Sequence, residues 1–207
     1  MQIFFDLDGT LIDSSKRLYL LFQSLVPVSG FTYDDYWALK KEQIDHNNIL
    51  INKFNYDNDQ VAEFEKEWML KIEDDNWLKL DEPFKGVTEM LKVLSIKHSL
   101  YIITNRQYNK PVYDQIDSFG WTTLLKYVFI TNQAMDKSTI IRNYTHPDTN
   151  DWLIGDTGTD IQQGKILGTR TAAVLSGFRS KENLQRYDPD CIVDSVLDVP
   201  FESVDYK

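Results

Sequence analysis

The chain has 207 residues, of which 42% are hydrophobic and 13% aromatic, so it can build a hydrophobic core. This length allows one larger domain, or a domain with a sizeable insert. The formal net charge of -10 argues against general affinity for nucleic acid and for anionic membranes, because both attract basic surfaces. We expect neither kind of partner.

The sequence also indicates a cytoplasmic location. Cys191 is the only cysteine, so no intrachain disulfide can form and a reducing compartment fits. The first predicted strand begins by Ile3, which leaves no room for a signal peptide. No apolar run is long enough to span a membrane.

The first part of the chain changes from a strand to helices. An apolar run predicts a strand over residues 2–7, and from Ser14 the apolar residues recur at helical spacing to about residue 82. Here we expect a helix from residue 14, a second that begins after Thr32 and continues to Leu50, and a third over 61–72. This stretch is too long for a simple connection between strands, so it predicts an inserted helical subdomain over residues 14–82.

The remainder alternates between helices and strands. Helices are predicted over residues 84–96, 107–118, 136–144 and 159–167, and strands over 100–103, 127–130, 152–154, 171–175 and 191–193. Continuous apolar strands that alternate with helices are typical of a parallel sheet covered on both faces. We therefore predict an α/β fold with a Rossmann-like three-layer core, formed by residues 1–13 and 83–207.

Two carboxylates follow the first strand. Asp6 and Asp8 lie one residue apart and Gly9 comes next. Burial of two acids at a strand end is costly without a cation or hydrogen-bond donors, and close acids raise each other's pKa. An Asp-Gly pair alone is compatible with an ordinary turn. The spaced pair after an apolar run instead indicates a metal ion or a catalytic role.

Two other predicted strands also end in polar residues. Thr104 and Asn105 follow the strand over 100–103, and Asp156 follows the strand over 152–154, with Asp160 one helical turn later. Ligands of such sheets bind outside the carboxyl ends of the strands. We therefore expect these side chains and the first two aspartates to share one site.

Carboxylates without histidine suit a hard cation such as Mg²⁺. A carboxylate can also act as a nucleophile that forms an aspartyl-phosphate. A second carboxylate two residues on can then protonate the leaving oxygen and activate water. A lysine should balance the phosphoryl charge. Lys137, at the start of a predicted helix after the third strand, is the best-placed candidate, ahead of Lys110 and Lys126.

With these residues the chain resembles the haloacid dehalogenase-like (HAD) hydrolase superfamily, in particular its phosphoglycolate phosphatase-like branch. Four motifs match in order across nearly all of the core. They are Phe5-Asp6-Leu7-Asp8-Gly9-Thr10-Leu11, Ile102-Ile103-Thr104-Asn105, Lys137 and Ile154-Gly155-Asp156-Thr157-Gly158-Thr159-Asp160. The family often has proline after the lysine, where this chain has Ser138.

The resemblance implies a role for each motif. Asp6 would be the nucleophile and a Mg²⁺ ligand, and Asp8 the general acid/base, with its backbone carbonyl also on the metal. Asp156 would ligate Mg²⁺, and Asp160 would do so directly or through water. The phosphoryl group would be bound by Thr104, Asn105 and Lys137.

The resemblance also implies that the insert over residues 14–82 is a helical cap of the C1 type, which closes over the site and selects the substrate. Several of its residues are candidates for the lining, although we expect the aromatic ones to pack within the cap: Tyr36, Trp37, Lys40, Lys41, His46, Asn47 and Asn48. The expected enzyme is a Mg²⁺-dependent phosphatase that acts on a small phosphorylated metabolite, as a monomer or weak homodimer.

Three alternatives remain open from the sequence. A dehalogenase uses the first aspartate but needs no acid at the second position, so Asp8 argues against it. A phosphotransferase of the β-phosphoglucomutase type would share every core motif and would differ by transferring the phosphoryl group. A signalling receiver domain also forms an aspartyl-phosphate, but it is shorter and has no long helical insert.

Overall fold

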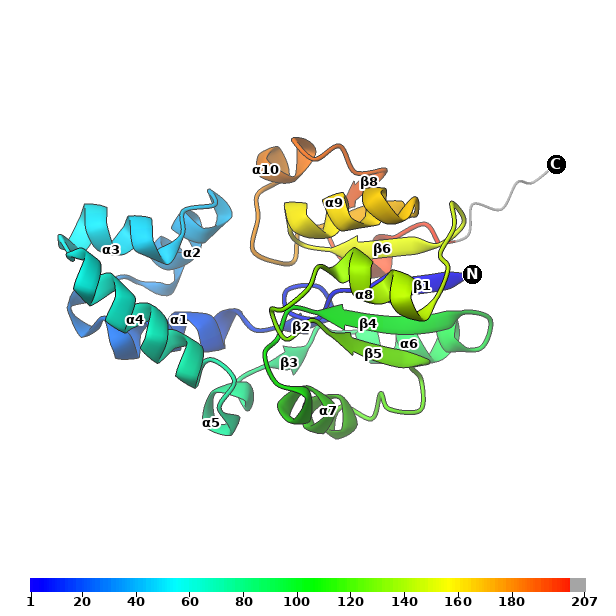
Figure 1. Ribbon diagram of the computed structural model, residues 1–207, viewed down its shortest axis with the longest axis horizontal. Helices are drawn as coiled ribbons and strands as arrows, with labels where there is room; N and C mark the ends of the chain where they lie inside the picture. Colours follow the sequence, from blue (N-terminus) through cyan, green and yellow to red (C-terminus); the bar gives the residue numbers. More distant parts are fainter. Residues whose placement is uncertain (202–207) are drawn as a thin grey trace.

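The computed structural model describes residues 1–201; residues 202–207, at the end of the predicted core, lie outside the described part. Within residues 1–201, six strands form one sheet in the order β5-β4-β1-β6-β7-β8, and all neighbouring pairs are parallel (Figure 1). The strands are β1 (Gln2–Phe5), β4 (Ser99–Thr104), β5 (Tyr127–Ile130), β6 (Trp152–Gly155), β7 (Arg170–Val174) and β8 (Cys191–Val193). The predicted α/β class with a mainly parallel sheet is confirmed.

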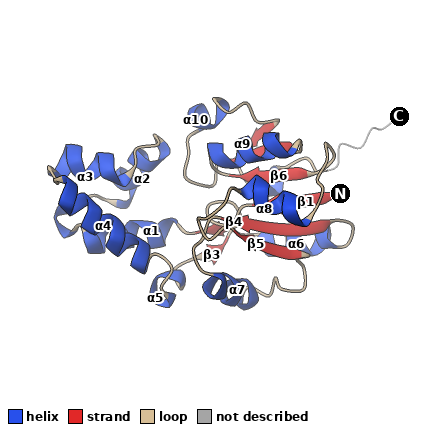
Figure 2. Ribbon diagram, in the orientation of Figure 1, coloured by secondary structure: helices blue, strands red, loops and turns tan. Residues whose placement is uncertain are grey.

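Helices cover both faces of this sheet (Figure 2). In β1, Ile3 and Phe5 join a buried cluster with residues of α6 (Val87–Ser95) and α7 (Asn109–Ser118), whereas Phe4 joins one with residues of α8 (Lys137–Tyr144) and α9 (Gly158–Leu167). Alternate residues of a strand point to opposite faces, so each apolar strand serves two cores. This arrangement is the predicted three-layer core.

The stretch between β1 and β4 is mainly helical. It contains α1 (Ser15–Leu25), α2 (Tyr33–Lys41), α3 (His46–Phe54), α4 (Asn58–Lys71) and the short α5 (Asp75–Leu78). The prediction of one helix from Thr32 to Leu50 is wrong. The chain turns at Gln43, whose φ of 64° is left-handed, and Asp45 then caps α3 by accepting a hydrogen bond from the Asn48 N–H at 2.7 Å. An Asp cap with a left-handed residue before it ends one helix and starts another.

Helices α1 to α4 enclose a hydrophobic core of their own, separate from the clusters on the sheet. Phe22 lies at its centre, fully buried, with its ring within 6.2 Å of the rings of Phe31, Tyr36, His46 and Phe64. Figure 1 shows this group of helices beside the sheet rather than on one of its faces. We call α1 to α4 the cap; its exact boundaries at residues 14 and 82 stay a prediction.

Truncation of Phe22 tests this second core. We expect Phe22→Ala to lower the free energy of unfolding by about 3–5 kcal/mol, because the variant loses apolar contacts and leaves a cavity. Urea denaturation followed by circular dichroism measures the change. Val28→Ala, at a side chain that is 74% exposed, is the control and should stay within about 0.5 kcal/mol of the parent. A loss below about 1 kcal/mol for Phe22→Ala would show that the cap is not held by this core.

Two short strands join the cap to the sheet domain. Strand β2 (Ile12–Asp13) pairs antiparallel with β3 (Glu82–Pro83), so the outgoing and returning segments of the chain run side by side. No strand was predicted for either segment. A two-residue ladder is too short to leave a periodic signal.

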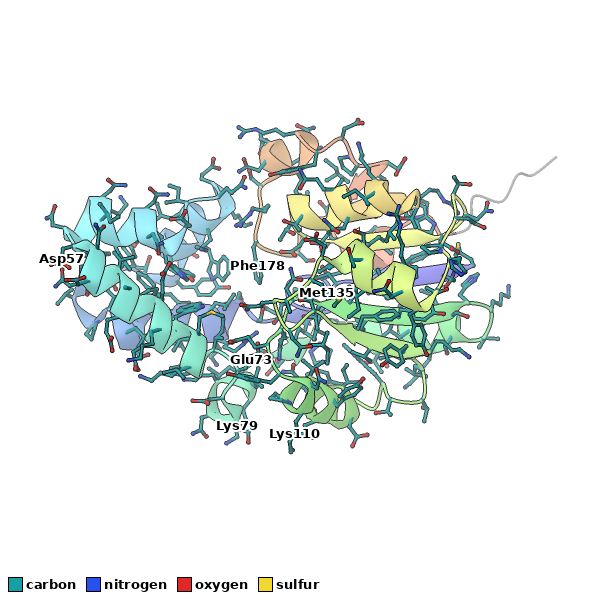
Figure 3. The ribbon with its side chains drawn as sticks, viewed as in Figure 1. Asp57, Glu73, Lys79, Lys110, Met135 and Phe178 are labelled. Atoms are coloured by element: carbon teal, nitrogen blue, oxygen red, sulfur yellow. The ribbon has the colours of Figure 1, made fainter. Side chains whose placement is uncertain are left out.

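A second contact joins the cap to the loop that precedes α10 (Lys181–Gln185). The rings of Phe178 and Trp37 stack at 5.4 Å, and the Ser180 N–H donates to the Lys41 carbonyl at 3.2 Å. Figure 3 shows Phe178 and Glu73 between the cap and the sheet domain. Among residues 1–201, no helix combines the length and the apolar character needed to cross a membrane.

Candidate active site

The predicted site residues of three strands meet at the carboxyl edge of the sheet. Asp6 follows β1, Asp156 follows β6, and Lys137 is the first residue of α8, which comes after β5. The Lys137 ammonium donates to Asp6 Oδ1 at 2.5 Å and to Asp160 Oδ1 at 2.6 Å. Lys137 is only 3% exposed, so this is a buried ion-pair cluster and not a surface contact.

Three carboxylates of this cluster can hold a cation. Asp6, Asp156 and Asp160 each offer an oxygen, and these oxygens lie within 4.8 Å of one another. Asp156 Oδ2 accepts a hydrogen bond from the Phe178 N–H at 2.7 Å, whereas its Oδ1 is buried without a hydrogen-bond partner among the described residues. An all-oxygen donor set with a free buried oxygen fits a hard divalent cation.

Local backbone structure determines where the carboxylates of Asp160 and Asp156 lie. Asp160 is the third residue of α9, and its Oδ2 accepts hydrogen bonds from the N–H and hydroxyl of Thr157, the residue that caps the helix. The positive end of the helix dipole favours a carboxylate there. A Cβ added at Gly155 would lie 2.2 Å from Asp160 Cγ, and one at Gly177 would lie 2.1 Å from Asp156 Oδ2. Only glycine therefore leaves room for these two carboxylates.

Burial dominates the electrostatics of the cluster. It raises the pKa of Asp6 to about 7, against the lowering effect of Lys137, and Asp160 and Asp8 raise it further. Burial also raises the pKa of Asp156 well above its usual range, with Asp6 and Asp160 adding to the effect. For Lys137, burial lowers the pKa, but Asp160 and Asp6 outweigh it and the pKa is raised. The single positive charge of Lys137 does not balance the negative charges of three crowded carboxylates. This charge imbalance also favours binding of a cation.

The other predicted phosphate ligands lie at the end of β4. Thr104 is buried and its hydroxyl accepts a hydrogen bond from the Arg106 N–H at 3.4 Å. Asn105 is exposed and its side-chain carbonyl accepts one from the Thr131 hydroxyl at 3.1 Å. Both residues line the same cavity as Asp6 and Lys137. Lys110 and Lys126 are exposed, and Lys110 pairs with Asp114, so neither competes with Lys137.

Asp8 lines the cavity, but its carboxylate is not part of the carboxylate cluster around Lys137. Its oxygens accept hydrogen bonds from Arg106 Nε and Nη2, both at 2.8 Å, and from Arg17 Nη2. Burial alone would raise the pKa of Asp8, but Arg106 and Arg17 outweigh it and hold that pKa below its ordinary value. The predicted contact of the Asp8 backbone carbonyl with a metal stays a prediction.

Neither arginine was predicted as a site residue. Arg106 comes directly after Thr104 and Asn105, so its position beside a site residue was a usable signal. Arg17 comes from α1 of the cap, and nothing in the sequence links it to Asp8. Asp81 was also missed; it is buried, and it accepts hydrogen bonds from Arg17 Nε at 2.8 Å and Arg106 Nη2 at 3.2 Å.

The cavity above the cluster has a volume of about 280 Å³, and both the cap and the sheet domain line it. None of the seven cap residues considered from the sequence is in this lining. Tyr36 packs inside the cap, where its hydroxyl hydrogen-bonds His46 Nε2 at 2.9 Å, and Trp37 is buried against Phe178. The wall on the cap side comes instead from α1, α4 and the two residues after α4, and it combines four apolar residues, Leu18, Trp68, Met69 and Ile72, with the charged Arg17 and Glu73.

The fold and the site together define a capped α/β enzyme with a carboxylate-rich active site. The family model for haloacid dehalogenase-like hydrolases matches residues 3–174. The chain belongs to this haloacid dehalogenase-like hydrolase family, as its motifs predicted.

The relatives of the chain are phosphatases and hydrolases. Pyrophosphatase PpaX of Listeria monocytogenes is 26% identical over 95% of this chain and 93% of its own length. Phosphoglycolate phosphatase of Aquifex aeolicus is 25% identical over 85% of both chains. The solved structure of a haloacid dehalogenase-like family hydrolase from Streptococcus pneumoniae has the same fold, with a TM-score of 0.75, 23% identity and coverage of 95% of this chain and 94% of that one. The prediction of a HAD-like phosphatase is confirmed at this level.

Proposed function

We propose that the chain is a Mg²⁺-dependent phosphomonoester hydrolase that acts on a small phosphorylated metabolite through an aspartyl-phosphate intermediate. The observation that carries the proposal is the buried contact of Lys137 with Asp6 and Asp160 beside Asp156. The named relatives, a pyrophosphatase and a phosphoglycolate phosphatase, support phosphorylated substrates of small size. A cytoplasmic location and a monomeric or weakly dimeric state remain expectations from the sequence.

In the proposed first step, one carboxylate oxygen of Asp6 attacks phosphorus as the bond to the leaving oxygen breaks. Lys137, which already contacts Asp6, orients this carboxylate and offsets charge on the phosphoryl oxygens. Thr104 and Asn105 hold the phosphoryl group from the end of β4. Asp8 donates a proton to the leaving oxygen, a role that its two arginines oppose because they favour its ionised form.

In the second step a water molecule attacks the aspartyl-phosphate and the bond between phosphorus and Asp6 breaks. Asp8 accepts the proton of the water, and the ionised state that Arg106 and Arg17 favour is the one this step needs. The cap excludes bulk water from the cavity while the reaction proceeds.

Asp6, Asp156 and Asp160 are the residues that would hold the cation. When bound, a divalent cation supplies electrostatic stabilisation of the phosphoryl oxygens. Mg²⁺ is proposed because it prefers carboxylate oxygens, with water and substrate phosphate completing its shell.

Multiple turnover tests the proposed reaction. With p-nitrophenyl phosphate and Mg²⁺ we expect release of many equivalents of phosphate per protein, because hydrolysis regenerates Asp6. The measurement is free phosphate against time. Release of p-nitrophenol that stops at about one equivalent, without free phosphate, would indicate a receiver-like end state in which the phosphoryl group stays on Asp6. Transfer to an added sugar phosphate without phosphate release would instead indicate a phosphotransferase.

A further inference from the structure

The turn between β5 and α8 has an unexpected residue at its second central position. The Ala134 N–H donates to the Thr131 carbonyl at 2.9 Å and so closes a four-residue turn. The two central residues, Asn132 and Gln133, have left-handed φ angles of 51° and 54°. Two left-handed central residues are typical of a type I′ turn, in which glycine is preferred at the second of them. This chain has Gln133 there.

The two central residues differ in what their side chains do. Asparagine tolerates a left-handed φ, and Asn132 Nδ2 donates to the Gln107 carbonyl at 2.6 Å and to Asn109 Oδ1 at 3.1 Å. The Gln133 backbone N–H donates to Thr131 Oγ1 at 3.2 Å, a bond that any residue except proline could make. The Gln133 side chain is exposed and makes no hydrogen bond to any described residue. No polar contact of this side chain within the protein therefore offsets its unfavourable φ.

The Gln133 side chain does line the catalytic cavity, the cavity of about 280 Å³ above Asp6 and Lys137. Together with Asn105 it also lines a second cavity of about 550 Å³, whose other residues are Thr131, Ala134, Met135 and Asp136. Gln133 therefore stands where the two cavities meet. An unfavourable backbone conformation at such a place points to a function of the side chain.

The other polar side chains of the catalytic cavity are already engaged. Those with a partner in the protein are Asp8, Arg17, Glu73, Arg106 and Thr157. Those proposed to hold the cation or the phosphoryl group are Asp6, Thr104, Asn105, Lys137, Asp156 and Asp160. Among the lining residues this leaves Gln133 as the side chain that can both donate and accept a hydrogen bond for the leaving group.

The chemistry of an amide indicates what Gln133 binds. An amide pairs well with a group that also donates and accepts, such as a hydroxyl or another amide. A further anion is disfavoured on this side, because the Asp136 carboxylate lines the adjoining cavity. We propose that the Gln133 side chain hydrogen-bonds an uncharged hydroxyl or amide group on the leaving group of the substrate and is a specificity-determining residue. This inference rests on the proposed phosphatase function.

A matched pair of substrates tests the inference. Glycerol 3-phosphate and propyl phosphate have the same carbon skeleton, but only the first carries hydroxyl groups on its leaving group. We expect the parent protein to favour glycerol 3-phosphate in kcat/KM by roughly 3- to 10-fold, the size of one neutral hydrogen bond. The measurement is free phosphate against time in Mg²⁺.

Two variants separate a contact with substrate from a structural role. Gln133→Gly suits the turn and removes the amide, so it should abolish the preference, leave kcat/KM for propyl phosphate near the parent value and not lower Tm. Gln133→Leu keeps a side chain of similar size and should also abolish the preference. Asn132→Gly is the matched control: it makes the same kind of change in the same turn, at a side chain outside the catalytic cavity, and should keep the preference.

The outcomes separate this inference from the proposed function. Equal kcat/KM for the two substrates in the parent protein, or an unchanged preference in Gln133→Gly, would overturn the inference and leave the phosphatase function in place. A lower Tm of Gln133→Gly, with equal losses for both substrates, would assign Gln133 a structural role only and overturn it as well.

Absence of phosphate release from every substrate, p-nitrophenyl phosphate included, would count against the proposed function. Calorimetry in Mg²⁺ with two phosphonates that cannot be hydrolysed, 3,4-dihydroxybutylphosphonate and butylphosphonate, then tests Gln133 alone. We expect tighter binding of the dihydroxy compound by the parent protein and loss of this difference in Gln133→Gly. Equal binding of the two phosphonates by the parent protein would refute the inference.

Discussion

Asp6→Asn is expected to lower kcat for phosphate release by about 10⁴- to 10⁶-fold, the scale of losing a catalytic nucleophile. The carboxamide is nearly the same size but is a poor nucleophile, so the first step has no attacking group. Lys137 and Thr104 stay in place and substrate can still bind. The loss should therefore appear in kcat, measured as free phosphate with p-nitrophenyl phosphate and Mg²⁺.

Asp188→Asn is the control for this variant. It makes the same chemical change at an exposed aspartate that pairs with Lys165 on the surface. We expect it to keep the parent activity. If Asp6→Asn retained substantial Mg²⁺-dependent activity while remaining folded, the assignment of Asp6 as the nucleophile would be wrong.

The sheet was predictable because its strands are short apolar runs that end in polar residues. Strand β5 was predicted with its observed bounds, and β4 and β6 differ from their predictions by one or two residues. Each run is apolar on both faces, as a central parallel strand must be. The order of the strands was not predicted, because it depends on pairing between segments far apart in the chain.

The site was predictable where its residues follow strands directly. The carboxyl edge of a parallel sheet brings strand ends together. At this edge Asp6 and Asp156 follow strands, Thr104 ends a strand, and Lys137 begins a helix. Arg17 could not be found in this way. It reaches Asp8 from a cap helix, and that contact depends on how the cap sits on the sheet domain.

The contacts at the two connections between the cap and the sheet domain were not predictable either. Arg17 in α1 and Arg106 after β4 share Asp81, which lies just before β3. This ion-pair cluster and the β2–β3 ladder tie both connections of the cap to the sheet domain. None of these contacts is local in sequence, so hydrophobic periodicity carries no information about them.

Removal of divalent cations should abolish activity and lower thermal stability. The three acids of the carboxylate cluster, Asp6, Asp156 and Asp160, outnumber Lys137, so a bound cation would relieve their repulsion in the folded state. At a Mg²⁺ concentration about 100-fold above its Kd, binding adds about 2.7 kcal/mol to the free energy of unfolding. For a chain of 207 residues this corresponds to a rise in Tm of about 5–10 °C. Differential scanning calorimetry with EDTA and with Mg²⁺ measures it.

The stabilisation by Mg²⁺ should depend on pH in a defined direction. Burial raises the pKa of Asp6 from 3.8 to about 7, so the metal-free folded state holds a proton that the unfolded chain has lost. The free energy of unfolding of the metal-free protein therefore falls as the pH rises from 3.8 to about 7. Mg²⁺ binds the ionised carboxylates, so its effect on Tm should be larger at pH 8 than at pH 6.

Asp156→Asn provides the specific test of the cluster. It removes the charge of the one acid whose Oδ1 lacks a hydrogen-bond partner among the described residues. We expect it to abolish most of the Mg²⁺-induced rise in Tm, whereas Asp188→Asn should leave the rise unchanged. The metal-free Asp156→Asn protein should melt no lower than the metal-free parent, because one of the crowded charges is gone. A full Mg²⁺ response in Asp156→Asn would place the cation elsewhere in the molecule.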